Sequence, residues 1–120
     1  MKQYKLGEME QRFADLIWQQ EPLSTRTLIG LCAGAFAWKR TTTYTMLKRL
    51  CERGIFQNDG GTVTALMSKS EFGAAQGEEF LNNSFGGSLP RFLAAFTRRK
   101  KLSDQEINEI ERLISAHREG

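Results

Sequence analysis

The sequence WKRTTTYTMLKRLCERG, from Trp38 to Gly54, decides the fold because it predicts a helix with two unlike faces. Thr43, Leu47 and Leu50 recur at the spacing of one helical face and form an apolar stripe. Hydroxyl and basic side chains occupy the opposite face, namely Thr41, Thr42, Thr45, Lys48 and Arg49, with Lys39, Arg40 and Arg53 at the ends. Short hydroxyls reach base edges and phosphates, and Lys and Arg supply charge for phosphates, so this pattern predicts a DNA-binding helix.

A purely structural interpretation of the same helix is a solvated basic surface without a ligand. Against it stands the run of threonines, since β-branched residues lose rotamer freedom and make a poor helix in isolation. Local helix stability therefore does not account for these residues, and we favour the DNA-binding interpretation.

Two further helices are predicted before this one. The first runs over about residues 6–20, and Pro22 ends the segment because the residue before a proline is pushed out of helical geometry. Ser24 is the expected N-cap of the second helix, and Gly34 is the expected left-handed residue that closes it. The third helix stops at Gly54 in the same way, with Ile55 folding back on Leu50. Two helices joined by a glycine-containing turn place the second in the major groove of DNA.

A β-hairpin is predicted after the third helix. Residues 55–57 and 62–66 have the pattern of its strands, and Asp59-Gly60 at the tip suits a two-residue turn with positive φ. The sequence therefore predicts a mainly α fold with a small β-hairpin wing, a winged helix-turn-helix, over residues 1–67. No lysine or arginine occurs from Gly54 to Ser68, so we expect the wing to be a weak DNA contact.

Residues 68–120 are predicted to be helical, with caps at Ser68, Ser88 and Ser103. Short amphipathic helices within about fifty residues cannot bury their apolar faces alone. We expect them to be dimerisation helices that pair with a second copy of the chain, the alternative being that they pack on their own N-terminal domain. The residues expected at the dimer contact are Phe92, Leu93, Phe96, Ile107, Ile110, Leu113 and Ile114.

Length and charge are those of one small domain, or of a small domain with an appendage. The 120 residues have a formal net charge of +3. The excess falls in residues 1–66, which hold nine Lys and Arg against six Asp and Glu. This half contains the threonine-rich helix, and its charge suits an acidic partner.

Catalysis, cofactors and bound metals are not expected. His117 is the one histidine and lies near the C-terminus, so neither a nucleophile–base pair nor a histidine metal site is formed. Glycine loops of the phosphate-binding type are absent. Cys32 and Cys51 belong to no Cys-x-x-Cys pair, so buried thiols in a reducing cytoplasm are the default and a redox switch between them is the alternative.

Secretion and membrane insertion are not predicted either. Residues 1–5 are followed by no apolar core of a signal peptide. The longest uncharged apolar run, residues 28–38, is too short to span a bilayer. We expect a cytoplasmic protein.

The spacing of Trp38, Thr42, residues 45–50 and Gly54 resembles that of the penicillinase and methicillin-resistance repressor family. Three other segments agree with this family in order and spacing, at residues 8–18, 85–89 and 102–107. The resemblance thus extends from about residue 6 to residue 114.

This resemblance implies a dimeric transcriptional repressor. Each winged helix would occupy half of an inverted-repeat operator in double-stranded DNA, and the C-terminal helices would interlock the two chains. The resemblance places Thr42 and Thr45 at bases or thymine methyls, and Lys48 and Arg49 at phosphate. Thr41 faces DNA with them, and Lys39 and Arg40 lie at the helix start, where backbone N–H groups also favour phosphate.

The resemblance also implies how repression is relieved. In that family a membrane-bound sensor with a metalloprotease domain detects cell-wall antibiotic, and the repressor is cut at an Asn-Phe bond in its dimerisation helices. The matching bond here is Ala95-Phe96, with alanine in place of asparagine. Copper-responsive relatives have a C-terminal cysteine cluster, which residues 115–120 lack.

Two other classes of function stay open at the level of sequence. A winged-helix module that binds protein instead of DNA is favoured by the wing without basic residues and opposed by the threonine-rich basic face. A repressor controlled by a small molecule would use an apolar pocket between the wing and the C-terminal helices. The phenylalanines that permit such a pocket fit core packing equally well.

Overall fold

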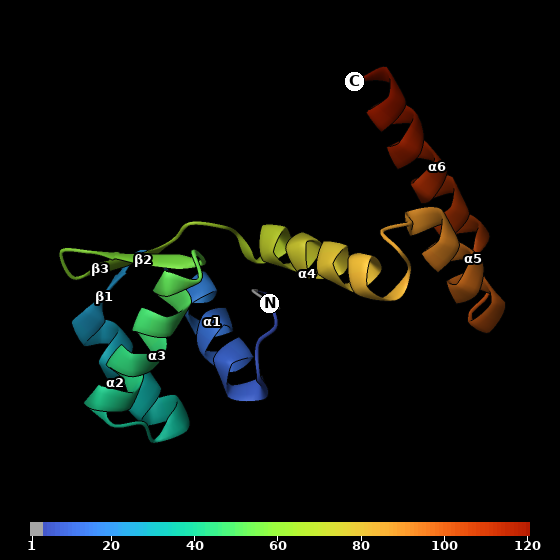
Figure 1. The fold of residues 1–120 in the computed structure, drawn as a ribbon. Helices are drawn as coiled ribbons and strands as arrows, with labels where there is room; N and C mark the ends of the chain where they lie inside the picture. The colour runs from blue at the N-terminus through green and yellow to red at the C-terminus, as the bar shows by residue number, and fades with distance from the viewer. Residues whose placement is uncertain (1–3) are drawn as a thin grey trace. The chain divides into compact units, whose positions relative to one another are not determined.

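The computed structural model describes residues 4–120, so Met1–Gln3 at the start of the predicted DNA-binding domain lie outside the described residues. The elements are α1 (Glu8–Gln20), β1 (Leu23–Ser24), α2 (Thr25–Phe36), α3 (Arg40–Glu52), β2 (Phe56–Asp59), β3 (Thr62–Ala65), α4 (Lys69–Ser84), α5 (Leu89–Arg99) and α6 (Asp104–Glu119) (Figure 1). Over residues 4–120, six helices and one small antiparallel sheet confirm the predicted winged-helix fold class. None of the helices in this described part is long and apolar enough to cross a membrane.

The chain divides into two compact units, Met1–Glu79 and Phe80–Gly120. The first unit includes the beginning of α4, because the buried ring of Phe72 packs against Trp18 and Tyr4 at centroid distances of 5.4 and 5.9 Å. Gln76 Nε2 also donates a hydrogen bond of 3.0 Å to the carbonyl of Tyr4. The first half of α4 therefore packs with the winged helix, and a functional division between residues 67 and 68 stays a prediction.

The predicted helix starts are formed by side-chain caps. Ser24 Oγ accepts a hydrogen bond from the amide of Thr27 at 3.0 Å, and Ser88 Oγ accepts one from Arg91 at 3.1 Å. Reciprocal capping boxes start the other two helices of the C-terminal half, at Ser68 with Glu71 and at Ser103 with Glu106. Each cap satisfies a backbone donor that the helix leaves unpaired.

The predicted end of the third helix is confirmed in detail. Gly54 has a left-handed φ of 80°, its amide donates to the carbonyl of Cys51 at 3.0 Å, and the amide of Ile55 donates to the carbonyl of Leu50 at 3.2 Å. This is the Schellman arrangement, and the side chains of Ile55 and Leu50 are both fully buried. The turn thus connects α3 to the wing, and the residues before and after it pack in the core.

The predicted end of the second helix is wrong. Gly34 is helical, α2 continues to Phe36, and Ala37 takes the left-handed conformation with φ 56°. A left-handed alanine costs roughly 1 kcal/mol, which aromatic packing offsets. The ring of Phe36 lies 4.9 Å from that of Trp38, which in turn lies 5.5 Å from Phe13. Trp38 therefore belongs to the link between helices, and α3 begins two residues later than predicted, at Arg40.

The wing hairpin is present, but its turn is shifted by one residue. Asp59 pairs with Thr62, so the two turn residues are Gly60 and Gly61, with φ 60° and 94°. Tight turns of this type need positive φ at both central positions, which two glycines supply at least cost. The side chain of Asn58 accepts from the amide of Gly61 at 3.0 Å and fixes the turn.

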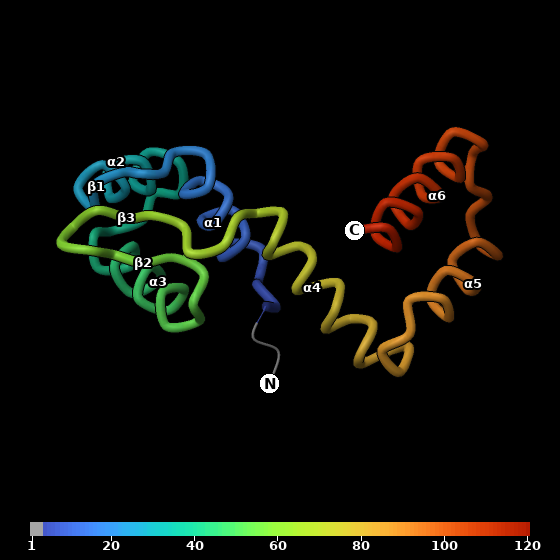
Figure 2. Tube along the Cα trace, turned by 90° about the horizontal axis from the view of Figure 1, so that it is seen from above, coloured from blue at the N-terminus to red at the C-terminus, as the bar shows by residue number. Residues whose placement is uncertain are grey.

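A third strand, β1, was not predicted. It pairs antiparallel with β3, with Leu23 opposite Val63, so that β3 lies between β1 and β2 (Figure 2). Two residues of alternating burial are too short a pattern to be found by periodicity. This strand ties the segment before α2 to the wing.

One hydrophobic core organises the first unit. Its buried members are Phe13, Ala14, Ile17, Leu23, Leu28, Cys32, Leu47, Leu50, Ile55, Phe56, Val63 and Phe72. They come from every helix and strand between α1 and the start of α4. The predicted apolar stripe of α3 is buried in this core, and the orientation of its opposite face is therefore fixed.

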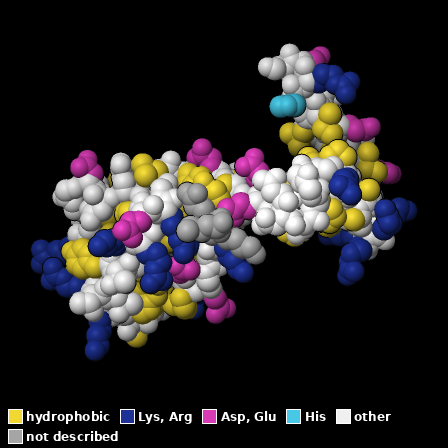
Figure 3. Space-filling model, viewed as in Figure 1, with side chains coloured by type: hydrophobic (Ala, Val, Ile, Leu, Met, Phe, Trp, Pro, Cys, Tyr) yellow, Lys and Arg dark blue, Asp and Glu magenta, His cyan; other side chains and the backbone are white. Residues whose placement is uncertain are grey.

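The second unit is assembled differently, since α5 and α6 contain no fully buried side chain. Rings from the end of α4, the following turn and α5 contact one another at centroid distances of 5.5 to 5.9 Å, those of Phe80, Phe85, Phe92 and Phe96. On the face drawn in Figure 3, hydrophobic side chains remain at the surface of α5 and α6. The unit thus exposes much of the apolar surface that a core would contain.

Candidate nucleic-acid interface

The exposed face of α3 presents a polar stripe to solvent. Thr41, Thr45 and Lys48 follow one another at spacings of four and three residues, and Glu52 extends the stripe by another turn. All four are exposed, while the opposite side of the helix is buried. The stripe offers hydroxyl donors and acceptors, one ammonium group and one carboxylate, which are groups that read base edges in the major groove.

The start of α3 adds positive charge. Lys39 is the N-cap residue and makes no side-chain capping bond, and no acidic residue occurs in the first turn. Thr42 is exposed next to Thr41. This helix start therefore combines its positive dipole end with two basic side chains, those of Lys39 and Arg40.

Arg49 lies at the edge of this face and contacts α1. Its Nη1 is 3.6 Å from Oε2 of Glu10, and Nη2 of Arg53 is 3.8 Å from the same oxygen. Arg53 also donates a hydrogen bond of 3.0 Å to the carbonyl of Lys5. Half of the Arg49 side chain is exposed, at 50%, so it is shared between the ion pair and solvent.

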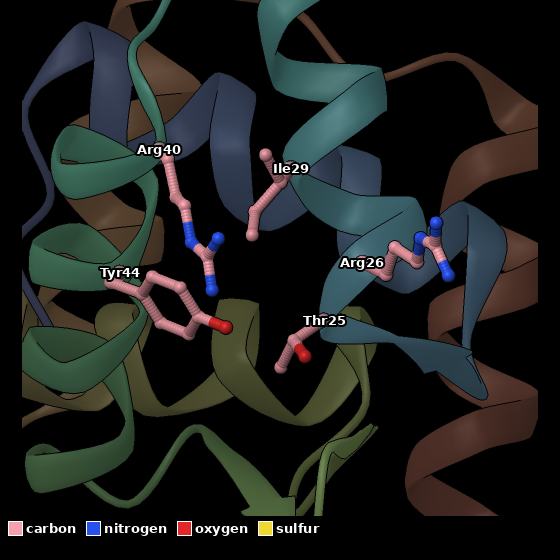
Figure 4. Close-up of a pocket in the computed structure, with 5 residues that line it drawn as sticks. All are labelled: Thr25, Arg26, Ile29, Arg40 and Tyr44. Atoms are coloured by element: carbon pink, nitrogen blue, oxygen red, sulfur yellow. The ribbon is translucent and has the colours of Figure 1, made fainter.

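The other edge of α3 borders a cavity of about 450 Å³ between α2 and α3. It is lined by Thr25, Arg26 and Ile29 of α2 and by Arg40 and Tyr44 of α3 (Figure 4). The Arg40 guanidinium carbon lies 5.6 Å from the centroid of the Tyr44 ring. Hydrogen bonds from the side chains of Thr25 and Arg40 lower the pKa of Tyr44.

The polar side chains of the wing are mostly used internally. Gln57 Nε2 donates to Thr64 Oγ1 at 3.2 Å, and Asn58 holds the turn. The carbonyl of Gly61 accepts from the amide of Thr25 at 2.9 Å, so the turn is fastened to the start of α2. These contacts give the wing a structural role beside α2.

The predicted dimerisation residues all lie on α5 and α6. Phe92 and Phe96 belong to the aromatic cluster, and Leu93, Ile107 and Ile110 line an apolar groove of about 440 Å³ between the two helices. Leu113 and Ile114 are 70% and 53% exposed. The bond between Ala95 and Phe96 lies inside α5, and both side chains are half-buried.

The cysteines and acidic residues form no reactive site in the described part of the chain. Cys32 is buried, Cys51 is half-buried, neither forms a disulfide, and burial raises the pKa of both thiols. A raised pKa disfavours the reactive thiolate. Between residues 4 and 120, no three His, Cys, Asp or Glu side chains converge into a group able to hold a metal ion.

Three residues near the interface were not predicted from the sequence, namely Glu10, Thr25 and Glu52. Glu52 was available from periodicity, because it continues the spacing of Thr45 and Lys48. The contacts of Glu10 with Arg49 and of Thr25 with Tyr44 depend on how α1 and α2 cross α3. No pattern within one helix indicates such contacts.

Comparison with known proteins covers both compact units. A family model described as penicillinase repressor matches residues 6–116. A penicillinase repressor of Bacillus licheniformis is 25% identical over 118 residues, which cover 95% of this chain and 92% of the relative. The match therefore includes the helix-turn-helix, the wing and the C-terminal helices.

Proposed function

This chain belongs to the penicillinase repressor family, a family of transcriptional repressors, and we propose that it acts as a dimer on an inverted-repeat operator in double-stranded DNA. The observation that carries the proposal is the polar stripe of α3, Thr41, Thr45 and Lys48, exposed opposite a buried apolar stripe. In a winged helix-turn-helix, the second helix of the motif enters the major groove. The stripe then faces the base edges of the operator. We place the repressor and its operator in the cytoplasm.

The chemistry of each side chain indicates which part of the DNA it contacts. Thr42 and Thr45 contact bases or thymine methyls, and Lys48 contacts phosphate or guanine. Lys39 and Arg40 contact phosphate at the helix start. Arg49 contributes less than its charge suggests, because Glu10 neutralises part of it.

Dimerisation is supported by the exposed apolar surface of the second unit. In a monomer, Ile107, Leu113 and Ile114 and the apolar groove stay in contact with water. Burying this apolar surface against a partner would be favourable. A second copy supplies the same surface with two-fold symmetry. The two α3 helices then read half-sites about one helical turn, roughly 34 Å, apart.

Relief of repression by a membrane sensor protease is part of the same proposal. We place the cut at Ala95-Phe96 within α5, the bond that matches the Asn-Phe bond of the family, with alanine in place of asparagine. A bond inside a helix must open locally before a protease reaches it, and α5 has no fully buried side chain to oppose opening. Exposing cells to a cell-wall antibiotic should produce a C-terminal fragment whose first residue is Phe96. An intact chain in cells that have induced the regulated genes would contradict cleavage as the route.

The operator function is tested by footprinting the DNA upstream of the chain's own gene. The wild type should protect an inverted repeat at low salt, and Thr45→Ala combined with Arg49→Ala should abolish protection while circular dichroism stays unchanged. Thr62→Ala, an exposed threonine on the wing, is the matched control and should leave the footprint intact. Absence of any footprint for the wild type at low salt would overturn the proposal and favour a protein-binding module.

A further inference from the structure

One cationic group and two hydroxyl groups line the cavity between α2 and α3. In Figure 4, Arg40 and Tyr44 converge from α3, with the Tyr44 hydroxyl beside the Arg40 guanidinium. Thr25 lies across the cavity on α2, and the guanidinium of Arg26 turns away from it. The floor is apolar at Ile29.

Charge in this cavity is entirely positive. Its lining residues include no carboxylate and two arginines, of which only Arg40 points its guanidinium toward the cavity. Among the described residues, Arg40 forms no ion pair, whereas Arg49 is paired with Glu10. Its guanidinium is held over the Tyr44 ring, so a ligand that binds there finds the group already in place.

Two of the backbone donors at the start of α2 are already used. The amide of Thr25 donates to Gly61 and the amide of Thr27 donates to Ser24. A ligand in the cavity therefore meets side chains, namely the guanidinium of Arg40 and the hydroxyls of Tyr44 and Thr25. A guanidinium flanked by hydroxyls is a donor set for a tetrahedral oxyanion.

The position of the cavity identifies the source of that oxyanion. Arg40 and Tyr44 each precede a member of the polar stripe, Thr41 and Thr45, by one residue on the same helix. A group bound between α2 and α3 therefore lies beside the face that meets the major groove. The groove is bordered by the sugar-phosphate backbone, which supplies a phosphodiester at that border.

We propose that Arg40, Tyr44 and Thr25 form a clamp for one backbone phosphate of the DNA at each half-site. This inference rests on the proposed function and assigns a partner group to a cavity beside α3. The clamp fixes the register of α3 in the groove without reading sequence. The bond from Thr25 to Gly61 gives the wing a part in this, because the wing turn holds the α2 wall of the cavity in position.

Two variants test the clamp, with Arg26→Gln as the control. Arg40→Gln removes the charge, and Tyr44→Phe removes only the hydroxyl while keeping the ring. Binding is measured by fluorescence anisotropy on a short duplex from the footprinted promoter and on a random-sequence duplex, across a range of salt. Arg40→Gln should weaken binding to both by roughly tenfold, the effect of one charge-assisted hydrogen bond, and reduce the salt slope by about 1.

Tyr44→Phe should weaken both duplexes equally and leave the salt slope unchanged. Arg26→Gln should have a smaller effect than Arg40→Gln, since its guanidinium faces away from the cavity. A loss confined to the promoter duplex would overturn the clamp and indicate a base contact. Wild-type affinity and slope in both clamp variants would overturn the clamp while leaving the repressor function standing.

Neutral methylphosphonate linkages, placed singly along the promoter duplex, locate the phosphate. One position should weaken the wild type and leave Arg40→Gln unaffected. Inorganic phosphate, titrated against the wild type by NMR, tests the other source of the same chemistry. Saturable binding of inorganic phosphate, without any linkage position that weakens the wild type and leaves Arg40→Gln unaffected, would assign the cavity to a free oxyanion and overturn the DNA clamp. Failure of the wild type to bind either duplex would instead contradict the proposed function.

Discussion

Glu10 on α1 and Arg49 on α3 form an ion pair, with Oε2 of Glu10 3.6 Å from Nη1 of Arg49. The same oxygen is shielded from solvent, accepts no hydrogen bond, and lies 3.8 Å from Nη2 of Arg53. A carboxylate in this place competes with any DNA phosphate for Arg49. The helix α3 therefore has one of its predicted basic residues partly neutralised by a residue of its own unit.

Glu10→Gln should strengthen binding to random-sequence DNA. With the carboxylate removed, Arg49 becomes available to a phosphate, and the slope of log affinity against log salt should steepen by up to about 1. Anisotropy titrations at several salt concentrations measure this slope. The double variant Glu10→Gln, Arg49→Gln is the control and should lose the gain. If Glu10→Gln alone leaves the slope at the wild-type value, Glu10 does not restrain Arg49.

Thr45→Ala and Lys48→Gln should have different effects, although their residues are neighbours on one stripe. Loss of a base contact at Thr45 should cost about 1–3 kcal/mol on the promoter duplex and little on random DNA. Loss of the phosphate contact at Lys48 should weaken both duplexes and reduce the salt slope by about 1. Paired titrations on the two duplexes separate these patterns. Equal losses on both duplexes for Thr45→Ala would place this residue at the backbone.

Local chemistry predicted most of the fold. The serine caps and the Gly54 turn involve residues within a few positions of one another. They could therefore be predicted from short stretches of the sequence. The prediction that α2 ends at Gly34 was wrong, because the helix ends at Ala37, where Phe36 packs on Trp38. Trp38 lies outside the helix, so no pattern within α2 indicates this contact. The strand β1 was missed because it exists only through pairing with β3.

The residues of the candidate interface could be predicted only where they lie on a single helix. Thr41, Thr45 and Lys48 follow from periodicity in α3, and the structure places all three on the exposed face. The cavity at Tyr44 requires Thr25 of α2, which lies in another helix. Its position is set by helix crossing and by the wing turn, which no local pattern describes.

DNA binding should weaken at alkaline pH through Tyr44. Its pKa is lowered from the ordinary tyrosine value by hydrogen bonds from Thr25 and Arg40. As pH rises toward that pKa, a growing fraction of tyrosinate repels the phosphate, so affinity falls.

Anisotropy titrations from neutral pH to about pH 9.5, below the ordinary lysine pKa, follow this loss. Tyr44→Phe should show a flatter profile, because only the wild type has the phenol. The lysines near DNA are the same in both proteins, so their contribution cancels in the comparison. Parallel profiles for the two proteins would show that Tyr44 does not approach a phosphate.

Phe72→Ala should destabilise the winged unit strongly. Phe72 is 1% exposed and packs against Trp18, so its removal leaves a cavity between α4 and the core. Large-to-small changes of a buried phenylalanine cost about 3–5 kcal/mol. Urea denaturation measures the free energy of unfolding. Leu66→Ala, at a residue 54% exposed beside the sheet, should change it by less than about 1 kcal/mol. Similar losses for the two variants would mean that α4 is not part of the winged unit's core.

Ile114→Asp should convert the proposed dimer into a monomer. Ile114 is exposed in the single chain, and two-fold pairing of α6 would bury it, so the substitution places an unpaired charge from each copy in an apolar contact. Light scattering should show the mass of two chains for the wild type and of one chain for the variant. Asn108→Asp adds the same charge at an exposed polar position of α6 and should remain dimeric. The monomeric variant should keep its circular dichroism and its weak affinity for random DNA, while losing the tight promoter complex that requires two linked α3 helices. A two-chain mass for Ile114→Asp would remove this part of α6 from the interface, and a one-chain mass for the wild type would contradict the dimer itself.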